Sequence, residues 1–452
     1  MNRSAARIVR AAAPVATLTP GVEAFASGDL LEGLSQTLAE ARADWSASRT
    51  VIARAGRTAR SLGSRKRRLH GDVLHALVRH DRTLDLLVDL AGLPPGSNRM
   101  ARARARTLAG LVALFGLDPQ GLDAAFDADD LRDPAHLLTG WVLETDPPDD
   151  EALGAAASLP TWIARELLRS FGDQAVAVAH ALNGRAPLAL RVLRGDRDAL
   201  AAELDADPSP LSPLALLLRG HADVRSTPAF AEGRVMVQDV GSQLIAELVG
   251  AAPGEVVVDA CAGAGGKTLA LAAAMEGRGR LIPCDVRADA LEEASSRLRA
   301  AGLSDVTEPL LLPEAGRLPK RLRKLEGAVD AVLVDAPCTG SGALRRRPQA
   351  RWIAHATDLH SLPKLQGAIL ERFAPLVRPG GRLVYATCSL FAPENDGVVD
   401  AFLRSTPGFR RVDPRFDPPR DETLVSGGCL RTRPDLHGTD GFFAAVLQRE
   451  AP

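Results

Sequence analysis

The sequence predicts a doubly wound, mostly parallel α/β domain in its second half, preceded by an all-α domain and a small mixed α/β domain. Three observations lead to this fold class. The chain of 452 residues is too long for one core, because domains average ~150 residues. A hydrophobic fraction of 46% and a charged fraction of 25% are typical of globular proteins. The hydrophobic pattern then changes along the chain, from helical periods to short β-branched runs that alternate with helices.

Residues 1–151 are expected to be helical. Alanine, leucine and arginine dominate this part, and apolar residues recur at spacings of three and four, so that Leu74, Leu77, Val78, Leu84 and Leu87 can share one helix stripe. Proline-containing breaks fall at residues 92–96 and 146–149. We therefore expect several helices here and a domain boundary after residue 151.

Residues 152–232 have a mixed pattern. They predict a helix over residues 161–170, a strand over 188–193 and a helix over 197–204. Pro208, Pro210 and Pro213 then interrupt any helix and predict a loop or linker.

Residues 233–452 alternate between strands and helices. Strands are expected over residues 256–258, 280–283, 331–334 and 382–385, and helices over 267–275, 288–300 and 363–377. Such alternation predicts a parallel sheet, in which ligands bind beyond the carboxyl ends of the strands.

The number and spacing of the cysteines and the hydropathy of the chain indicate the cellular compartment of the protein. The cysteines are Cys261, Cys284, Cys338, Cys388 and Cys429, an odd number without a C-x-x-C pair. This disfavours a disulfide framework or a zinc ribbon, so we expect free thiols and no metal site. No apolar run is long enough to span a membrane, and no secretory signal is recognisable. We expect a soluble cytoplasmic protein.

Basic residues are clustered although the formal net charge is only −1. One run comprises Arg65, Lys66, Arg67 and Arg68, a second spans residues 99–106, and a third comprises Arg345, Arg346 and Arg347 with Arg351. A single run is usually a solvated face, but three runs in a nearly neutral protein favour a nucleic-acid partner.

A glycine-rich turn follows the first strand of the α/β domain. It reads Cys261, Ala262, Gly263, Ala264, Gly265, Gly266 and Lys267, and its glycines allow a ligand to approach the backbone. A P-loop would need glycine at Cys261, and a dinucleotide fingerprint would need glycine at Thr268. A nucleoside cofactor without a long phosphate chain fits better, and S-adenosylmethionine is the leading candidate. Asp285 ends the next strand, where a carboxylate commonly binds ribose hydroxyls. A merely structural turn is the alternative.

Two cysteines follow strands. Cys338 lies in the motif that starts at Asp335, and Cys388 lies just after the strand over residues 382–385. An isolated cysteine is most often inert and buried. At the carboxyl ends of parallel strands, however, both thiols face the ligand cleft. A thiolate that adds to carbon 6 of a pyrimidine activates carbon 5 toward a methyl donor.

These motifs resemble those of the Sun (Fmu, RsmB) family of RNA cytosine carbon-5 methyltransferases. The resemblance covers residues 237–444 well, with supporting matches at residues 365–366, 393–395 and 440–443. It continues more weakly through the helical part, which looks like the NusB-like RNA-binding domain of that family. The resemblance implies a Rossmann-like methyltransferase domain that uses S-adenosylmethionine.

The resemblance also implies roles for individual residues. Cys388 would be the nucleophile that adds to cytosine carbon 6, and Cys338 would assist removal of the carbon-5 proton and release of the enzyme. Asp335 would contact the cytosine ring and the methyl region of the cofactor. The turn from Cys261 to Lys267 would hold the methionine part, and Asp285 the ribose.

The chain departs from the family pattern at several positions. The turn lacks the usual Ala-Ala-Pro-Gly-Gly-Lys sequence, and Gln349 and Leu193 replace an acidic residue and an asparagine. The aspartate expected to approach the adenine has no counterpart in residues 309–313, and the nearest carboxylate is Glu314. The adenine contact is therefore unassigned.

The expected substrate is an unpaired or flipped cytosine in RNA, most of all small-subunit ribosomal RNA, bound by a monomer. The three arginines at 345–347, Arg351 and the basic run at 65–68 would contact phosphates. Trp352 would stack on a base or, more in keeping with tryptophan, pack in a core. The alternatives are transfer RNA as substrate and a non-catalytic RNA-binding or ribosome-assembly factor. A nucleotide hydrolase is disfavoured by Cys261.

Overall fold

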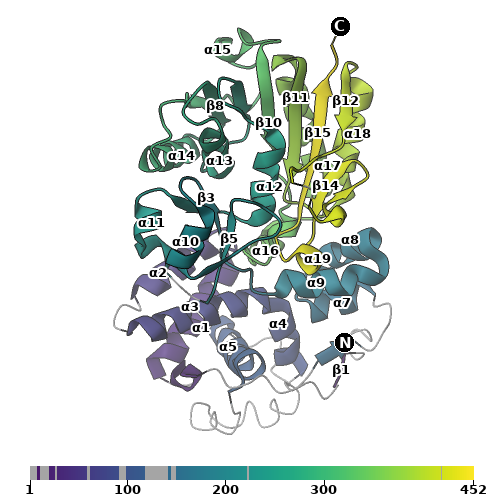
Figure 1. Ribbon diagram of the computed structural model, residues 1–452. Coiled ribbons are helices and arrows are strands. Elements are labelled where there is room, and N and C mark those ends of the chain that lie inside the picture. The colour runs from purple at the N-terminus through teal and green to yellow at the C-terminus, as the bar shows by residue number, and fades with distance from the viewer. Residues whose placement is uncertain are drawn as a thin grey trace. The chain divides into compact units, whose positions relative to one another are not determined.

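The computed structural model describes residues 8–10, 20–25, 28–58, 62–90, 98–117, 141–143, 149–220, 223–418 and 420–451 (Figure 1). The chain forms two compact units: Met1–Gly184 with Leu344–Ala356, and Arg185–Ala343 with Thr357–Pro452. The segment Leu344–Ala356, which follows the Cys338 motif, thus belongs to the first unit. Among the described residues, no helix has both the length and the apolar character that a membrane span requires.

The first unit is built mainly of helices, as predicted. They are α1 (Gly28–Ala43), α2 (Ser48–Thr58), α3 (Ser64–Arg79), α4 (Asp81–Leu90) and α5 (Arg99–Phe115), with the short η2 (Val22–Phe25). Leu74, Leu77, Val78 and Leu84 of the predicted stripe are buried in their core, and the side chain of Leu87 lies outside the described part. The prediction of one helix for this stripe is wrong, because its residues are divided between α3 and α4. The antiparallel pair β1 (Ile8–Arg10) and β2 (Trp141–Leu143) was not predicted. The predicted break at residues 92–96 and most of the break at 146–149 lie outside the described residues.

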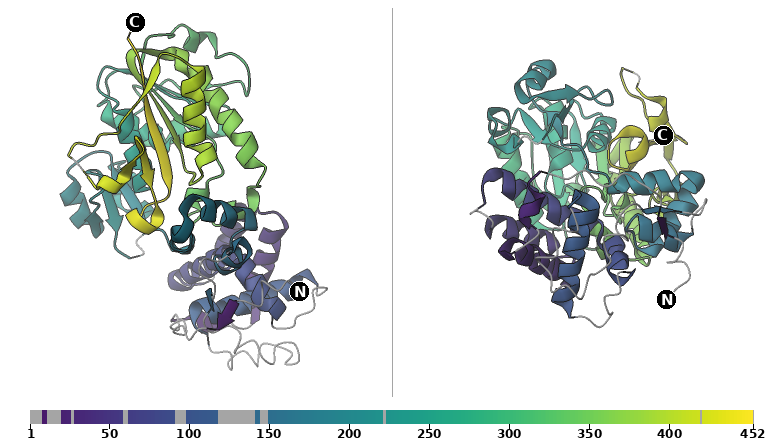
Figure 2. Two further views of the ribbon diagram at one scale, coloured as in Figure 1. Left: turned by 90° about the vertical axis from the view of Figure 1, so that its right-hand side faces the viewer. Right: turned by 90° about the horizontal axis from the view of Figure 1, so that it is seen from below.

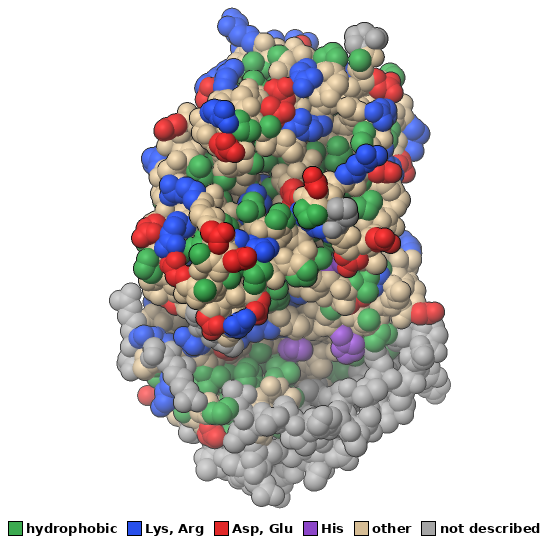
Figure 3. All heavy atoms as spheres, in the orientation of Figure 1, with side chains coloured by type: hydrophobic (Ala, Val, Ile, Leu, Met, Phe, Trp, Pro, Cys, Tyr) green, Lys and Arg blue, Asp and Glu red, His purple; other side chains and the backbone are tan. Residues whose placement is uncertain are grey.

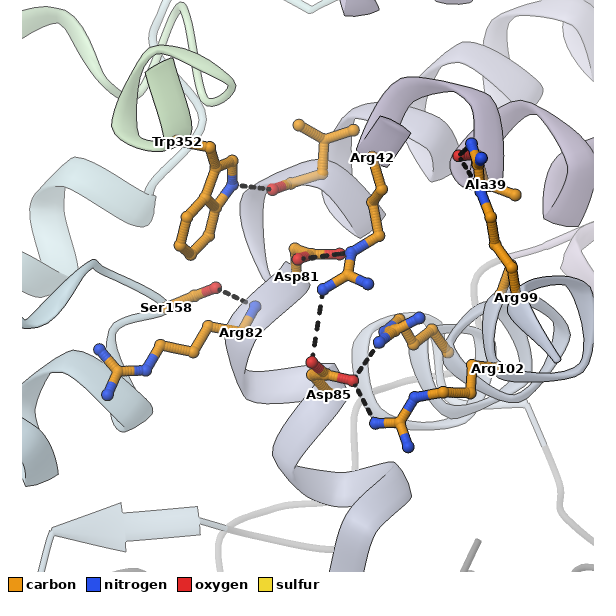
Figure 4. Close-up of polar contacts among 12 residues, drawn as sticks. Ala39, Arg42, Asp81, Arg82, Asp85, Arg99, Arg102, Ser158 and Trp352 are labelled. Atoms are coloured by element: carbon orange, nitrogen blue, oxygen red, sulfur yellow. Dashed lines mark hydrogen bonds and ion pairs between the residues drawn. The ribbon is translucent and has the colours of Figure 1, made fainter. Parts of the chain in front are cut away.

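Helices α7 (Asp150–Ala156), α8 (Thr161–Phe171) and α9 (Ala175–Asn183) also belong to the first unit, with η5 (Gly172–Gln174) and the short α16 (Ala350–Ile353). The division of the structure therefore does not fall after residue 151, where we expected a boundary. Hydrogen bonds explain this. Arg82 Nη2 lies 2.6 Å from Glu151 Oε2. The backbone nitrogen of Arg82 also donates to Ser158 Oγ over 3.0 Å, as Figure 4 shows.

An ion-pair network joins helices α1, α4 and α5 (Figure 4). Asp85 Oδ1 accepts from Arg102 over 2.7 Å and also from Arg106, and Arg42 Nε donates to Asp81 over 2.9 Å. Arg99 of the same run donates to the carbonyl of Ala39. Three arginines of the 99–106 run therefore bind acceptors inside this unit, and the run is a weaker indication of a nucleic-acid surface than its sequence suggested.

The second unit contains a small antiparallel sheet of order β4–β5–β3–β6. Its strands are β3 (Ala189–Val192), β4 (Ala206–Pro208), β5 (Ala215–Leu218) and β6 (Val235–Val237), and its helices are α10 (Arg197–Leu204) and α11 (Pro228–Ala231), after η6 (Val224–Ser226). The predicted strand and the helix over residues 197–204 are confirmed. The predicted linker is wrong in part, because it holds β4 and leads into β5. Pro208 is tolerated there because β4 is an edge strand.

The large sheet has nine strands in the order β13–β14–β15–β11–β10–β7–β8–β9, with β12 paired to β15. Strands β7 (Val256–Asp259), β8 (Arg280–Asp285), β9 (Leu310–Leu311), β10 (Val329–Asp335) and β11 (Val377–Thr387) are parallel. The antiparallel part comprises β12 (Phe409–Val412), β13 (Val425–Ser426), β14 (Cys429–Thr432) and β15 (Phe442–Arg449). The four predicted strands are all present and lie in the parallel part, so the doubly wound fold is confirmed. The sheet as a whole is mixed, because β12 to β15 add an antiparallel part that was not predicted.

Helices cover both faces of this sheet (Figures 1 and 2). One face carries α12 (Val240–Val249), α13 (Gly266–Ala274) and α14 (Ala288–Ala300), and the other carries α15 (Lys320–Arg323), α17 (Asp358–Phe373) and α18 (Asp396–Ser405). Successive residues of a strand pack in opposite cores. Val257 and Leu333 pack under α12 to α14, whereas Val258 and Val334 pack under α15, α17 and α18. Helix α17 begins five residues before the predicted start at Pro363. Short elements complete the unit: η7 (Ser341–Ala343), η8 (Ala374–Leu376), η9 (Ala392–Glu394), η10 (Glu422–Leu424) and α19 (Pro434–His437).

Candidate active site

The predicted site residues follow strands that are neighbours in the sheet. Strands β11, β10, β7 and β8 lie side by side and run in parallel, so their carboxyl ends meet at one edge. Cys388 follows β11, Cys338 follows β10, the glycine turn follows β7, and Asp285 ends β8. The topology therefore brings together residues from four separate parts of the chain.

The two thiols are close to each other. Cys338 Sγ and Cys388 Sγ are 3.3 Å apart although 50 residues separate them in sequence, and both side chains are only partly buried. Gly342 N donates to the carbonyl of Cys388 over 2.9 Å, which ties the two loops together. The hydrogen bond to Cys388 and burial raise the pKa of the Cys338 thiol well above its usual range. Cys338 therefore holds its proton at neutral pH.

Lys267 and Asp335 form an ion pair beside the thiols. Lys267 Nζ lies 2.5 Å from Asp335 Oδ2, and the lysine side chain is only 9% exposed. Its ammonium group also lies 5.4 Å from the centre of the Phe442 ring. Burial opposes the charge of Lys267, but the neighbouring Asp335 carboxylate outweighs it and raises the pKa of the lysine. The pair therefore places a positive charge and a carboxylate at the end of β10.

The glycine turn is attached to the end of β8. Gly263 N donates to Asp285 Oδ2 over 2.8 Å, and Ala262 N donates to the carbonyl of Cys284 over 2.9 Å. At Gly265, with φ of +78°, a Cβ would lie 2.8 Å from that of Ala294, so a side chain would clash with α14. Asp285 is 8% exposed, and its carboxylate caps the turn in addition to the ribose role that the sequence implies.

The surroundings of the turn fit S-adenosylmethionine. At Gly263 and Gly266 an added Cβ would meet no atom within 4 Å, so open space borders the backbone there. Val286 and Leu311, at the ends of β8 and β9, are 45% and 52% exposed and offer an apolar surface next to Asp285. Such an apolar surface suits the base of a nucleoside. The carboxylate of Asp285, which suits the ribose, lies between this surface and the glycine turn. Among the described residues, no group of His, Cys, Asp and Glu has the arrangement of a metal site.

Asp259 is a buried acid that the sequence analysis did not single out. Its carboxylate is 1% exposed and accepts a hydrogen bond from Thr268 Oγ1 over 2.7 Å. Burial raises the pKa of this carboxyl to about 7. Its place as the last residue of β7, directly before the turn, was a signal available in the sequence.

The basic segment after Cys338 is not the exposed cluster that we expected. Arg351 is fully buried, and its Nη1 donates to the carbonyls of Arg79 and Ser158 and to Asn183 Oδ1 over 2.9, 3.0 and 2.8 Å. The expected phosphate contact by Arg351 is therefore wrong, because the guanidinium faces acceptors at the ends of three helical segments. Arg345 is also buried, at 5% exposure, whereas Arg347 is exposed and Arg346 is partly so.

Trp352 packs within the first unit. Its Nε1 donates to the carbonyl of Val78 over 3.4 Å (Figure 4), and its ring stacks on that of Trp45 with centroids 6.0 Å apart. This agrees with the packing role that we favoured over base stacking.

Exposed basic side chains occur on two neighbouring helices of the first unit. Lys66, Arg67 and Arg68 are exposed on α3, while the side chain of Arg65 lies outside the described part. Helix α2 packs beside α3 and adds the exposed Arg49, Arg54 and Arg57, which the sequence analysis did not identify. By contrast, on the face drawn in Figure 3, basic and acidic side chains are interspersed. Helices α2 and α3 thus bring exposed basic side chains together, although Arg54 forms an ion pair with Glu40.

Together, the doubly wound sheet, the glycine turn and the acidic strand end define a Rossmann-like methyltransferase. Residues 246–448 match the family described as 16S rRNA methyltransferase RsmB/F, and residues 159–225 match the ferredoxin-like domain of RsmF/B-like methyltransferases. The chain belongs to the RsmB/F family of ribosomal RNA methyltransferases.

Curated relatives and solved structures agree. Ribosomal RNA small subunit methyltransferase B of Vibrio cholerae is 34% identical over 72% of this chain and 75% of its own length. The protein of the same name from Pseudomonas putida is 33% identical over 85% of this chain and 90% of its own length. A methyltransferase homolog protein from Pyrococcus horikoshii has 26% identity and a TM-score of 0.56, over 67% of this chain and 99% of its own.

Proposed function

We propose that this protein transfers a methyl group from S-adenosylmethionine to carbon 5 of a cytosine in small-subunit ribosomal RNA, through a covalent cysteine–cytosine adduct. The observation that carries the proposal is the 3.3 Å separation of the Cys338 and Cys388 sulfurs, beside the Lys267–Asp335 pair and the glycine turn. Two thiols that serve adjacent atoms of one pyrimidine ring have to be close together.

The proposed chemistry divides the work between the thiols. The thiolate of Cys388 forms a bond to cytosine carbon 6, and the electron pair of the ring double bond moves toward carbon 5. The bound cofactor supplies an electrophilic methyl group for carbon 5. Cys338 first loses its thiol proton to solvent. Its thiolate, a strong base because the hydrogen bond to Cys388 and burial raise its pKa, then removes the carbon-5 proton. The bond between sulfur and carbon 6 breaks, its electrons return to Cys388, and the double bond is restored.

The remaining site residues hold and orient the cytosine ring and the cofactor. Asp335, fixed by Lys267, faces the cytosine ring and the methyl region of the cofactor. The turn from Cys261 to Lys267 receives the methionine part, and Asp285 receives the ribose. Val286 and Leu311 cover the adenine by apolar packing.

We propose that residues 1–151, which include helices α1 to α5 of the first unit, form a NusB-like RNA-binding domain. Residues 159–184 of the same unit fall in the stretch that matches the ferredoxin-like domain. The exposed basic residues of α2 and α3, together with Arg347, supply phosphate contacts, so affinity for RNA should fall with salt. The choice of small-subunit ribosomal RNA rests on the names of the relatives, and transfer RNA is the alternative substrate. A ribosomal substrate also implies a cytoplasmic location.

The test is incubation of the purified protein with methyl-labelled cofactor and either small ribosomal subunits, deproteinised ribosomal RNA or transfer RNA, followed by nucleoside analysis. Label in 5-methylcytidine from the ribosomal samples is expected. Cys388→Ala should abolish transfer, and Cys338→Ala should accumulate a protein–RNA adduct. Cys429→Ala is the matched control and should behave as wild type, because Cys429 is a buried thiol at the start of β14. Label in another nucleoside, or none, contradicts the proposal.

One observation favours a second candidate, a non-catalytic RNA-binding or assembly factor. At the end of β9, where the family has an aspartate for the adenine, this chain exposes Leu311. Calorimetry with S-adenosylhomocysteine distinguishes the two functions. Absence of binding at millimolar ligand supports the factor, and binding supports the enzyme.

A further inference from the structure

Glu394 is a buried carboxylate that contacts both cysteine loops. It ends η9 and has no exposed surface. Oε1 accepts from the backbone nitrogen of Thr339 over 2.8 Å, and Oε2 accepts from the hydroxyls of Thr339 and Ser389 over 2.6 and 2.5 Å. Gln366 Nε2, on α17, donates to Oε1 over 3.2 Å.

The donors occupy equivalent positions in the two loops. Thr339 immediately follows Cys338, and Ser389 immediately follows Cys388. Gln366 Nε2 also donates to the carbonyl of Pro337, the residue before Cys338, over 2.8 Å. One carboxylate group therefore joins the residues that flank the two thiols.

Further hydrogen bonds fix the backbone on either side of the carboxylate. Tyr385 donates its hydroxyl proton to the carbonyl of Glu394 over 2.6 Å, and Asn395 Nδ2 donates to the carbonyl of Ser389 over 3.0 Å. Burial of a carboxylate is costly unless its oxygens accept several hydrogen bonds. The hydrogen bonds from both cysteine loops compensate the burial of the Glu394 carboxylate. The same bonds hold the two loops at a fixed distance from each other.

We propose that Glu394 is a positioning residue that holds Cys338 and Cys388 at the separation required for attack at carbon 6 and proton removal at carbon 5. The inference rests on the proposed function for its chemical meaning. The spacing itself is measurable without RNA or cofactor.

The spacing can be measured as the rate of disulfide formation with diamide. In this reaction the two thiols give up two hydrogens, diamide is reduced to its hydrazine, and one S–S bond forms. A disulfide has a sulfur separation of ~2.05 Å, so the sulfurs have to move together by only about 1.3 Å from the 3.3 Å observed. Rapid oxidation of wild type, lost in Cys338→Ala, is expected.

Two variants of Glu394 distinguish the effect of its position from the effect of its charge. Glu394→Gln removes the charge and places an amide donor against hydrogen-bond donors. It should slow disulfide formation by about tenfold or more, since misplacement by about 1 Å can cost about 100-fold in rate. Glu394→Asp keeps the charge but shortens the side chain, and it should slow the reaction as well. The negative charge of Glu394 contributes to the raised pKa of Cys338, so Glu394→Gln should also shift the pH profile of Cys338 alkylation to lower pH, whereas Glu394→Asp should not.

Glu326→Gln, an exposed glutamate outside the site, is the matched control and should oxidise as wild type. Melting curves show whether each variant folds. If Glu394→Gln does not fold, Ser389→Ala, which removes one donor to the carboxylate, takes its place and should also slow oxidation. Folded variants that oxidise at the wild-type rate overturn the proposal. If the Glu394 variants oxidise slowly but the wild-type protein forms no 5-methylcytidine, the positioning role of Glu394 is upheld. Only the proposed function is then overturned.

Discussion

Substitution of Arg351 by methionine tests whether this arginine stabilises the first unit or binds RNA. The sequence placed Arg351 in a cluster of phosphate-binding arginines, whereas the structure buries it completely. A structural role predicts a less stable protein, and an RNA-binding role predicts lower affinity at unchanged stability. The variant is informative because methionine is similar in length and apolar, so the cavity that it leaves is small.

The expected loss follows from the contacts of the guanidinium. Methionine leaves three acceptors without this donor: the buried carbonyl of Ser158, and the partly buried carbonyl of Arg79 and Asn183 Oδ1. Each buried polar group left unsatisfied costs about 1–3 kcal/mol. Relief of the buried charge offsets part of this, because burial and the nearby Arg79 guanidinium already lower the pKa of Arg351. We therefore expect the free energy of unfolding to fall by about 3 kcal/mol, which is near the lower end of the summed cost of the three unsatisfied acceptors.

The assay is urea unfolding followed by circular dichroism, with RNA binding measured as a function of salt. Arg347→Met is the matched control, because Arg347 is exposed in the same segment. It should leave stability unchanged and reduce the salt dependence of RNA binding by about one ion. The reasoning is refuted if Arg351→Met loses less than about 1 kcal/mol of stability, the smallest cost of one unsatisfied group, while its RNA affinity falls.

Two further predictions concern the buried charges of the active site. Burial raises the pKa of Asp259 from 3.8 to about 7, so the folded protein retains a proton that the unfolded chain releases. The stability of wild type should therefore fall as pH rises between these two values and level off above them, and Asp259→Asn, compared by thermal unfolding at several pH values, should remove this dependence. Lys267→Met leaves Asp335 without its cation and should lower stability by about 3 kcal/mol. It should also weaken binding of S-adenosylhomocysteine in calorimetry, and unchanged affinity would argue against a role of Lys267 at the cofactor site.

Local sequence signals determined much of this protein. The strands of the parallel sheet, the helix over residues 288–300 and the turn after β7 were all recognisable, because β-branched runs, helical periods and glycines act over a few residues. The approach of the two thiols also followed from local signals. Both end parallel strands, and parallel strands place their carboxyl ends at one edge of a sheet.

Only the tertiary structure decided which charged residues are buried. Arg347 and Arg351 belong to one basic segment in the sequence, yet one is exposed and the other is enclosed by acceptors from helices far away along the chain. Glu394 was visible only as part of a motif, and its bonds to both cysteine loops depend on contacts across the sheet edge. Burial and hydrogen bonding of a charge depend on residues distant in sequence, so a local pattern determines the element that carries a side chain but not the partners that surround it.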